Sequence, residues 1–208
     1  GRNGRTLRDM PREKWHRMSS ETLDICAPVA RGRGLNRTYR ELQDLAFKHL
    51  QPWRYDILSK AVAKARNRRR DLIDAVQTTV EASFSAVGME TQILGREKTL
   101  YSIYRKMDEK HLSFAQVTDI YGFRVVVPKA IDCYTALGLM HQLYKPVPGK
   151  FKDYIAIPKL NGYQSLHSTL VGPAGVNVEF QFRTQAMDAV AETGVAAHWL
   201  YKANEKDE

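Results

Sequence analysis

The sequence has little cysteine and no long apolar run. Only two cysteines, Cys26 and Cys133, occur in 208 residues, and neither has a histidine or another cysteine at zinc-binding spacing. This argues against a thiolate metal site and fits a reducing compartment better than a secreted setting. No stretch approaches the roughly 18 apolar residues of a membrane span, and the start of the sequence lacks the apolar core of a signal peptide. We therefore expect a cytoplasmic protein with no membrane partner.

Two common nucleotide-binding motifs are also missing. The chain contains no Gly-x-x-x-x-Gly-Lys-Ser/Thr loop and no Gly-x-Gly-x-x-Gly after a strand, which excludes P-loop and dinucleotide-binding enzymes. Positive charge, by contrast, is abundant: 32 Lys and Arg against 23 Asp and Glu give a net charge of +9. Such a balance predicts attraction to nucleotides, nucleic acid or acidic lipid, and the charge alone does not choose among them.

Apolar periodicity divides the chain into a helical first part and an alternating α/β second part. Residues 39–50 and 53–87 repeat apolar positions with a helical period, and Gly88 ends this pattern. The first part also contains a basic cluster near Arg69, which we interpret as a solvated helix face rather than a nucleic-acid stripe because no aromatic residues are interleaved with it. After Gly88 the predicted strands are Glu90–Leu94, Ile120–Val127, Tyr154–Ile157, Leu166–Val171 and Val176–Phe182, and the predicted helices are Glu97–Lys110, Ile131–Tyr144 and Gln185–Lys202.

The beginning of the helix predicted at Glu97–Lys110 is a candidate phosphate site. Lys98, Ser102 and Lys106 are spaced four residues apart and would share one exposed face. They would lie below a helix N-terminus, whose free amides favour phosphate. A solvated basic helix would show the same spacing, so both interpretations stand.

Two carboxylates lie where a divalent cation could be held. Asp119 precedes a predicted buried strand, and Glu179 belongs to the strand Val176–Phe182, where polar and apolar residues alternate. Period two places Glu179, Gln181 and Arg183 on one face of a sheet, although a half-exposed structural strand would alternate in the same way. The same parity relates Lys150, Lys152 and Tyr154, and also Lys159, Asn161 and Tyr163, which predicts one polar groove. Carboxylates among many cations are suited to phosphoryl or pyrophosphoryl transfer with Mg²⁺.

Five motifs together resemble the RelA/SpoT-type synthetases of guanosine tetra- and pentaphosphate, the alarmones of the stringent response. The motifs are Gly95-Arg96-Glu97-Lys98 with residues 101–107, Asp119-Ile120-Tyr121-Gly122-Phe123-Arg124, residues 159–167, Glu179-Phe180-Gln181-Phe182-Arg183-Thr184 and Gly194-Val195-Ala196-Ala197-His198-Trp199. The resemblance implies an α+β nucleotidyltransferase-like fold, with a mixed sheet of about five strands flanked by helices and preceded by a helical region. It further implies a remnant of the family's hydrolase domain with connecting helices at 1–51, the synthetase domain at 52–203 and a tail at 204–208.

The resemblance also implies a reaction, transfer of pyrophosphate from ATP to the 3′-hydroxyl of GDP or GTP, and a role for each matching residue. Asp119 and Glu179 would be catalytic and would bind Mg²⁺, with Glu179 activating the acceptor hydroxyl. ATP would be bound by Arg96, Lys98, Ser102, Lys106 and Arg124. The acceptor nucleotide would be bound by Lys150, Lys152, Lys159, Asn161, Tyr163, His167 and Gln181, with Tyr163 stacking on guanine.

Partners beyond the two nucleotides follow from the same resemblance. Long members of the family associate with the ribosome through regulatory domains that this sequence does not include, and no specific DNA partner is expected. The basic segment Lys150-Phe151-Lys152-Asp153 is similar to the version that favours GDP. The alternative function is a catalytically silent module that senses nucleotides or binds the ribosome or RNA, although a pure binder gains nothing from carboxylates that face phosphates.

Overall fold

The structure is a computed structural model, which describes residues 36–117 and 120–193. These residues fall into two compact units. The first contains described residues 36–64, 99–111 and 192–193, and the second contains residues 65–98, 112–117 and 120–191. Asp119, the segment 1–35 and the predicted helical residues 194–202 lie outside the described residues. The division into domains at 1–51, 52–203 and 204–208 stays a prediction.

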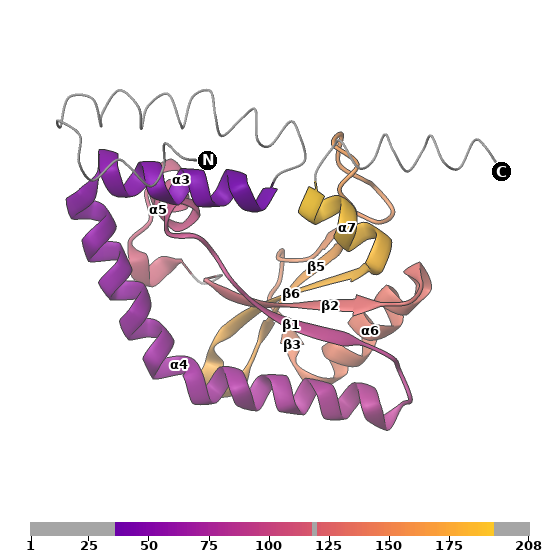
Figure 1. Cartoon of the computed structure of the whole chain (residues 1–208). Helices are drawn as coiled ribbons and strands as arrows, with labels where there is room; N and C mark the ends of the chain where they lie inside the picture. The colour runs from indigo at the N-terminus through magenta and orange to yellow at the C-terminus, as the bar shows by residue number, and fades with distance from the viewer. Residues whose placement is uncertain (1–35, 118–119, 194–208) are drawn as a thin grey trace. The chain divides into compact units, whose positions relative to one another are not determined.

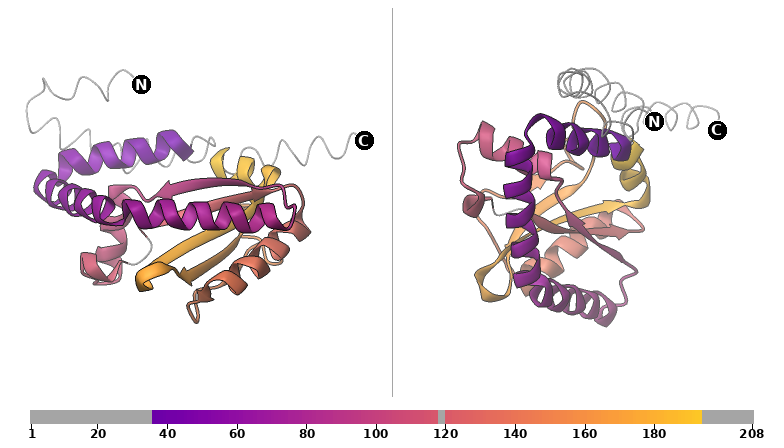
Figure 2. Two further views of the ribbon diagram at one scale, coloured as in Figure 1. Left: turned by 90° about the horizontal axis from the view of Figure 1, so that it is seen from below. Right: turned by 60° about the vertical axis from the view of Figure 1, so that its left-hand side comes forward.

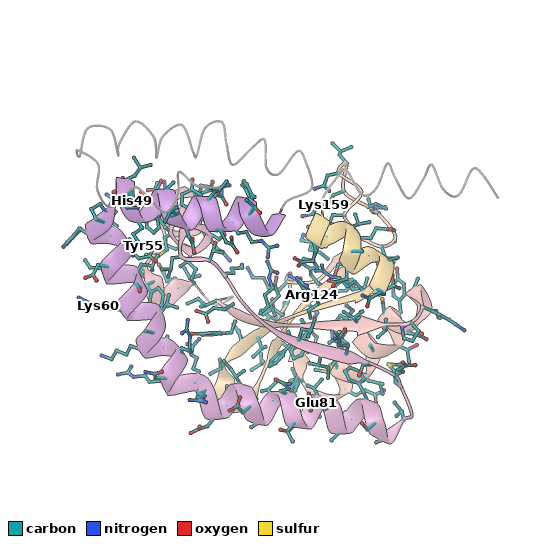
Figure 3. The ribbon with its side chains drawn as sticks, viewed as in Figure 1. His49, Tyr55, Lys60, Glu81, Arg124 and Lys159 are labelled. Carbon is teal, nitrogen blue, oxygen red and sulfur yellow. The ribbon has the colours of Figure 1, made fainter. Side chains whose placement is uncertain are left out.

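The first unit packs three helical segments around an aromatic cluster. Its elements are α3 (Asn36–Leu50), the beginning of α4 (Pro52–Ala86) and α5 (Leu100–Glu109). The ring of Phe47 on α3 stacks on that of Tyr104 on α5, with centroids 4.6 Å apart. The Asp44 carboxylate of α3 accepts a hydrogen bond of 2.8 Å from the backbone N–H of Tyr101, so it satisfies a free amide at the start of α5. Figure 3 labels His49 of α3 and Tyr55 of α4 in this unit.

Helix α5 begins later than the sequence suggested. The prediction of Glu97–Lys110 was wrong at its start, because Thr99 is the N-cap and its hydroxyl accepts a hydrogen bond of 3.3 Å from the Ser102 N–H. Lys98 therefore precedes the helix. The prediction that Lys98, Ser102 and Lys106 share one helical face was wrong. The preceding residues are extended instead: strand β1 covers Gln92–Glu97, where the sequence predicted a strand at Glu90–Leu94.

The second unit contains a mixed sheet of six strands (Figure 1). Besides β1, the strands are β2 (Tyr121–Val127), β3 (Lys145–Pro146), β4 (Lys152–Asp153), β5 (Leu166–Val171) and β6 (Asn177–Thr184). Their order is β1-β2-β6-β5-β3, and β4 also pairs with β5. The pair β2–β6 is parallel and the other pairs are antiparallel. This confirms the predicted α+β class with a mixed sheet.

One face of this sheet holds the apolar core. The second half of α4 and helix α6 (Ala130–Leu143) lie beneath it in Figure 1, and Figure 2 shows that half of α4 crossing the strands when seen from below. The core comprises Val76, Val80 and Phe84 of α4, Cys133, Ala136 and Met140 of α6, and Phe123, Val125, Val127, Leu166, Leu170, Val178, Phe180 and Phe182 of the strands. The opposite face carries the polar partners of these alternating residues.

A predicted strand at Tyr154–Ile157 is a turn in the structure. The extended residues are Lys152 and Asp153 of β4, and the Asp153 carboxylate then accepts hydrogen bonds of 2.9 Å from the Ile155 N–H and 2.8 Å from the Ala156 N–H. This aspartate turn folds the backbone out of the strand. Short 3₁₀ turns occupy η4 (Phe114–Gln116) and η5 (Pro173–Gly175), and α7 (Gln185–Thr193) follows β6 directly. In the described part of the chain, no helix combines the length and the apolar character needed to span a membrane.

Candidate functional site

The polar face of the sheet gathers its functional side chains in two adjacent rows. Strand register aligns Arg96, Gly122, Glu179 and Thr169 in one row. The next row aligns Arg124, Gln181, His167 and Lys152. Partners directly opposite each other in neighbouring strands point to the same face. The register therefore brings together residues from β1, β2, β4, β5 and β6, as the predicted polar groove requires.

A glycine opens the space beside Glu179. A Cβ at Gly122 would lie 2.6 Å from the backbone oxygen of Glu179 and 3.4 Å from its Cβ. No side chain fits at that position while β2 and β6 remain paired. The narrow hollow at this point is lined by Arg96, Lys98, Ile120, Gly122, Phe123, Glu179 and Gln181. Glu179 thus faces a space that two cationic side chains border.

A hydrogen-bond network surrounds His167. Arg183 donates through Nη2 to the hydroxyl oxygen of Tyr163 at 2.9 Å. That hydroxyl lies 2.6 Å from Nε2 of His167. The direction of that hydrogen bond depends on which imidazole nitrogen carries the proton. The other ring nitrogen, Nδ1, lies 3.8 Å from Oε1 of Glu179. The network therefore places the imidazole beside the carboxylate.

His167 is neutral at physiological pH. Burial, followed by the positive charges of Arg183 and Lys159, lowers the pKa of its imidazole from 6.5 to about 3. Burial raises the pKa of the Tyr163 phenol, and burial also lowers the pKa of the Arg183 guanidinium. The contact between His167 and Glu179 is therefore not an ion pair, and the negative charge of Glu179 stays available to a cation or a proton.

This depressed pKa predicts a stability loss in acid. The unfolded chain protonates His167 below pH 6.5, whereas the folded chain keeps the neutral form until about pH 3. Stability linked to this group is therefore complete above pH 6.5 and falls as the pH decreases towards 3. At pH 5 the loss amounts to about 2 kcal/mol. Urea unfolding of the wild type and of His167→Gln at pH 7.5 and pH 5 measures it, since the other titrating groups cancel. An equal acid sensitivity of the two proteins would contradict the assignment.

Tyr163 is held by a tight turn. The Gly162 N–H donates to the oxygen of Lys159 at 2.8 Å, and Gly162 adopts a φ of 75°, which a residue with a side chain rarely adopts. Asn161 accepts a hydrogen bond of 3.2 Å from the Tyr163 N–H. The ammonium of Lys159 lies 4.5 Å from the ring centroid of Tyr154 and 5.1 Å from that of Tyr163. The turn thus brings one ammonium group against two aromatic rings, a combination that suits a nucleobase with its phosphates.

Asp188 is a site residue that the sequence analysis missed, and Arg183 was placed on the polar face without a role. Oδ1 of Asp188 lies 3.1 Å from Nη1 of Arg124 and 3.4 Å from Nη1 of Arg183. Arg183 was indicated by the alternating polar set of β6 and by the motif at residues 179–184. Asp188 stands in the first turn of α7, where an acidic residue usually indicates a favourable helix end. Nothing local marks it as a partner of two arginines.

The remaining predicted residues are more dispersed. Ser102 and Lys106 belong to α5 of the first unit, so the structure gives them no place relative to the polar face. Lys150 and Lys152 are exposed, and the register places Lys152 directly opposite His167. Gln181 is buried and donates to Glu179 at 3.4 Å. Arg124 is half-buried, and Figure 3 shows it with Lys159 on the side of the sheet that carries α7.

The donor groups at Glu179 are compatible with Mg²⁺. Within residues 36–117 and 120–193, no three carboxylate, thiol or imidazole groups gather in a metal-binding arrangement. Mg²⁺, however, often takes only one or two carboxylates and completes its shell with phosphate oxygens and water. Glu179 offers such oxygens on the polar face, where Nδ1 of the neutral His167 lies 3.8 Å from its carboxylate. The buried thiol of Cys133, whose pKa burial raises to about 12, offers no reactive alternative.

The fold and this face define a class: a mixed-sheet α+β domain with a cation-rich polar face suited to phosphorylated ligands. A family model described as a region found in RelA / SpoT proteins matches residues 95–206, which is more than half of the chain. The chain belongs to this family.

Relatives agree with the assignment. The chain is 48% identical over 202 residues to a guanosine-3′,5′-bis(diphosphate) 3′-pyrophosphohydrolase of Vibrio cholerae, and the match covers 97% of this chain and 29% of that protein. It is 48% identical over 200 residues to the bifunctional (p)ppGpp synthase/hydrolase SpoT of Escherichia coli, with coverage of 96% and 28%. The chain thus spans less than a third of the length of these relatives.

A solved structure shares the fold. The small alarmone synthetase 2 of Bacillus subtilis has a TM-score of 0.54 and 29% sequence identity with this chain, and the match covers 69% of this chain and 82% of that one.

Proposed function

We propose that the chain is a GTP/GDP pyrophosphokinase domain, which transfers pyrophosphate from ATP to the 3′-hydroxyl of GDP or GTP and so makes (p)ppGpp. The name of the Vibrio cholerae relative specifies hydrolysis, and that of the Escherichia coli relative specifies both synthesis and hydrolysis. The structural match to an alarmone synthetase supports the synthetic reaction. The observation that carries the proposal is the half-buried Glu179 carboxylate on the polar face of the sheet, where it lines a narrow hollow together with Arg96 and Lys98.

Glu179 is the proposed general base. It removes the proton of the acceptor 3′-hydroxyl while that oxygen attacks the β-phosphorus of ATP. The bond from the β-phosphorus to the bridging α–β oxygen breaks, and AMP leaves with that oxygen. The proton passes from Glu179 to solvent after transfer. The neutral His167 supports this role, because it lies beside the carboxylate without neutralising its charge.

Cationic side chains disperse the charge that the phosphates carry during transfer. Arg96 and Lys98 border the hollow at Glu179, so they are assigned to the ATP phosphates or base. Arg124 is assigned to adenine. Mg²⁺ would be held by Glu179 together with Asp119, and when bound it would neutralise phosphate charge. Ser102 and Lys106 keep their proposed roles at ATP.

The acceptor nucleotide is assigned to the turn that carries Tyr163. A purine on the Tyr163 ring would take the place of the Lys159 ammonium, which would then be free to bind a phosphate. Lys150, Lys152 and Asn161 are exposed, Lys152 lies opposite His167 in the strand register, and Gln181 is buried. The ribosome as a partner and the cytoplasm as the location stay predictions.

The proposal is tested by incubating the chain with ATP labelled in its β-phosphate, GDP or GTP, and MgCl₂. We expect AMP and a 3′-pyrophosphorylated guanosine nucleotide in equal amounts, and no product when EDTA is added. Initial rates with GDP and with GTP determine the acceptor preference. Binding of both nucleotides without turnover would instead favour the silent nucleotide-sensing module.

A further inference from the structure

One aspartate connects the two nucleotide subsites of the proposed function. Oδ1 of Asp188 lies within 3.4 Å of a terminal nitrogen of both Arg124 and Arg183. The Arg124 side chain is 12% exposed and that of Arg183 is 2% exposed, so solvent screens these contacts little. Two cations share a single carboxylate oxygen, which means that neither arginine can move without changing the charge balance at the other.

Arg183 carries this connection to the acceptor side. Its Nη2 donates to the hydroxyl of Tyr163 at 2.9 Å and also contacts Oε1 of Gln181. Its carbon Cζ lies 5.2 Å from the centroid of the Tyr163 ring. Its Nε is buried without a hydrogen-bond partner among the described residues. A buried donor without a partner is costly, so the present position of this guanidinium is one that a rearrangement can improve.

Arg124 carries the connection to the ATP side. It lies on β2 directly opposite Gln181 of β6, in the row next to Gly122 and Glu179. An ATP molecule that draws the Arg124 guanidinium towards its base or phosphates would weaken the Arg124–Asp188 contact. The Asp188 carboxylate would then attract Arg183 alone, and Arg183 would release the Tyr163 hydroxyl. Tyr163, freed from the buried network, would present its ring to the acceptor base.

We propose that Asp188 is a positioning residue that couples the ATP subsite to the acceptor subsite, by holding Arg124 and Arg183 through one carboxylate oxygen. The proposal rests on the proposed function, because it uses the assignment of Arg124 to ATP and of Tyr163 to the acceptor. Asp188 contacts neither nucleotide in this scheme. Its effect is a mutual increase in affinity, so that each nucleotide binds more tightly when the other is present.

The test is calorimetric titration of GDP into the chain, without and with a saturating non-hydrolysable ATP analogue. For the wild type we expect the GDP dissociation constant to fall about fivefold or more with the analogue, the lower range of typical coupling. We call the GDP dissociation constant without the analogue, divided by that with the analogue, the coupling ratio. In Asp188→Asn, which keeps the size and removes the charge, this ratio should be within twofold of one. Asp71→Asn, the same change at an exposed position of α4, should keep the wild-type ratio.

The ratio separates coupling from a merely structural role. A general loosening of the fold would weaken both nucleotides and lower the unfolding temperature, but it would leave the ratio unchanged. If Asp188→Asn fails to fold, Tyr163→Phe serves instead, since it removes the hydroxyl that Arg183 binds and keeps the ring. In that variant the ratio should also fall towards one, while ATP binding alone stays within twofold of the wild type.

The outcomes distinguish the two proposals. A wild-type ratio near one, or an unchanged ratio in Asp188→Asn or Tyr163→Phe, would overturn the coupling while nucleotide binding and turnover remained. Failure of the wild type to bind ATP analogue and GDP at all would overturn the proposed function, and the coupling with it.

Discussion

Glu179→Gln is expected to lower the turnover number for pyrophosphate transfer by about 10³-fold or more, the upper range for loss of a general base. Glutamine keeps the size of the side chain and can still hydrogen-bond Gln181, but it cannot accept the hydroxyl proton or hold a divalent cation. Nucleotide binding should change little, because Arg96, Lys98 and the Tyr163 turn remain. Initial rates of product formation measure the loss of turnover, and calorimetric titration with GDP measures nucleotide binding separately.

Glu109→Gln is the matched control for this substitution. Glu109 pairs with Arg105 one turn earlier on α5, and both side chains are more than half exposed. Such a surface pair contributes little to stability. The turnover number of Glu109→Gln should therefore equal that of the wild type. Wild-type turnover in Glu179→Gln would remove the base from the mechanism. A parallel loss of GDP binding would show instead that Glu179 mainly holds the site together.

Gly122→Ala is expected to have the second large effect, on folding as well as on turnover. The new Cβ would lie 2.6 Å from the Glu179 carbonyl oxygen, closer than real Cβ contacts allow. That oxygen is backbone and cannot rotate away, so β2 and β6 must separate. We expect the free energy of unfolding to fall by about 3 kcal/mol, the range for forced overpacking. Most of the turnover should also be lost, because Glu179 is displaced together with β6. Urea unfolding and the transfer assay measure the two losses.

Gly95→Ala provides the control on the neighbouring strand. A Cβ at Gly95 has no atom within 4 Å, although Gly95 pairs with Phe123 of β2, next to Gly122. This variant should retain turnover and should be as stable as the wild type or more so, since alanine reduces the freedom of the unfolded chain. Equal stability of Gly122→Ala and wild type would mean that the two strands tolerate a wider spacing than the structure shows.

The strands with strong alternation were predictable. β5 was predicted as it is found, and β6 differs by only one or two residues at each end, because period-two patterning is repeated over six or more residues. The predicted strand Ile120–Val127 and helix Ile131–Tyr144 agree with β2 and α6 to within one residue at each end. Short-range hydrogen bonds account for two predictions that were wrong. Thr99 begins α5 through its hydroxyl, and the Asp153 carboxylate turns the chain where a strand was predicted. Hydrogen bonds from a side chain to the nearby backbone compete with helix and strand formation within one turn. The spacing of apolar residues does not reveal these hydrogen bonds.

The polar face was predicted as a set, but its connections were not. The alternation of side chains along one strand placed Glu179 and Gln181 on the same face, and the structure confirms that they share it. Alternation within one strand does not determine the register between strands that are distant in the chain. The juxtaposition of Arg96 with Gly122 and Glu179 therefore appears only in the folded sheet. The roles assigned to these residues stay proposals that the experiments above test.

The sequence by itself determined the class of the fold, the family and most of the polar residues, because these depend on local periodicity and on motifs read in order along the chain. Only the tertiary structure decided that His167 is neutral and that Asp188 holds two arginines. Both facts depend on burial and on charges brought together from β2, β5, β6 and α7. Electrostatic energy depends on distance and desolvation in space, and neither can be read from separation along the chain.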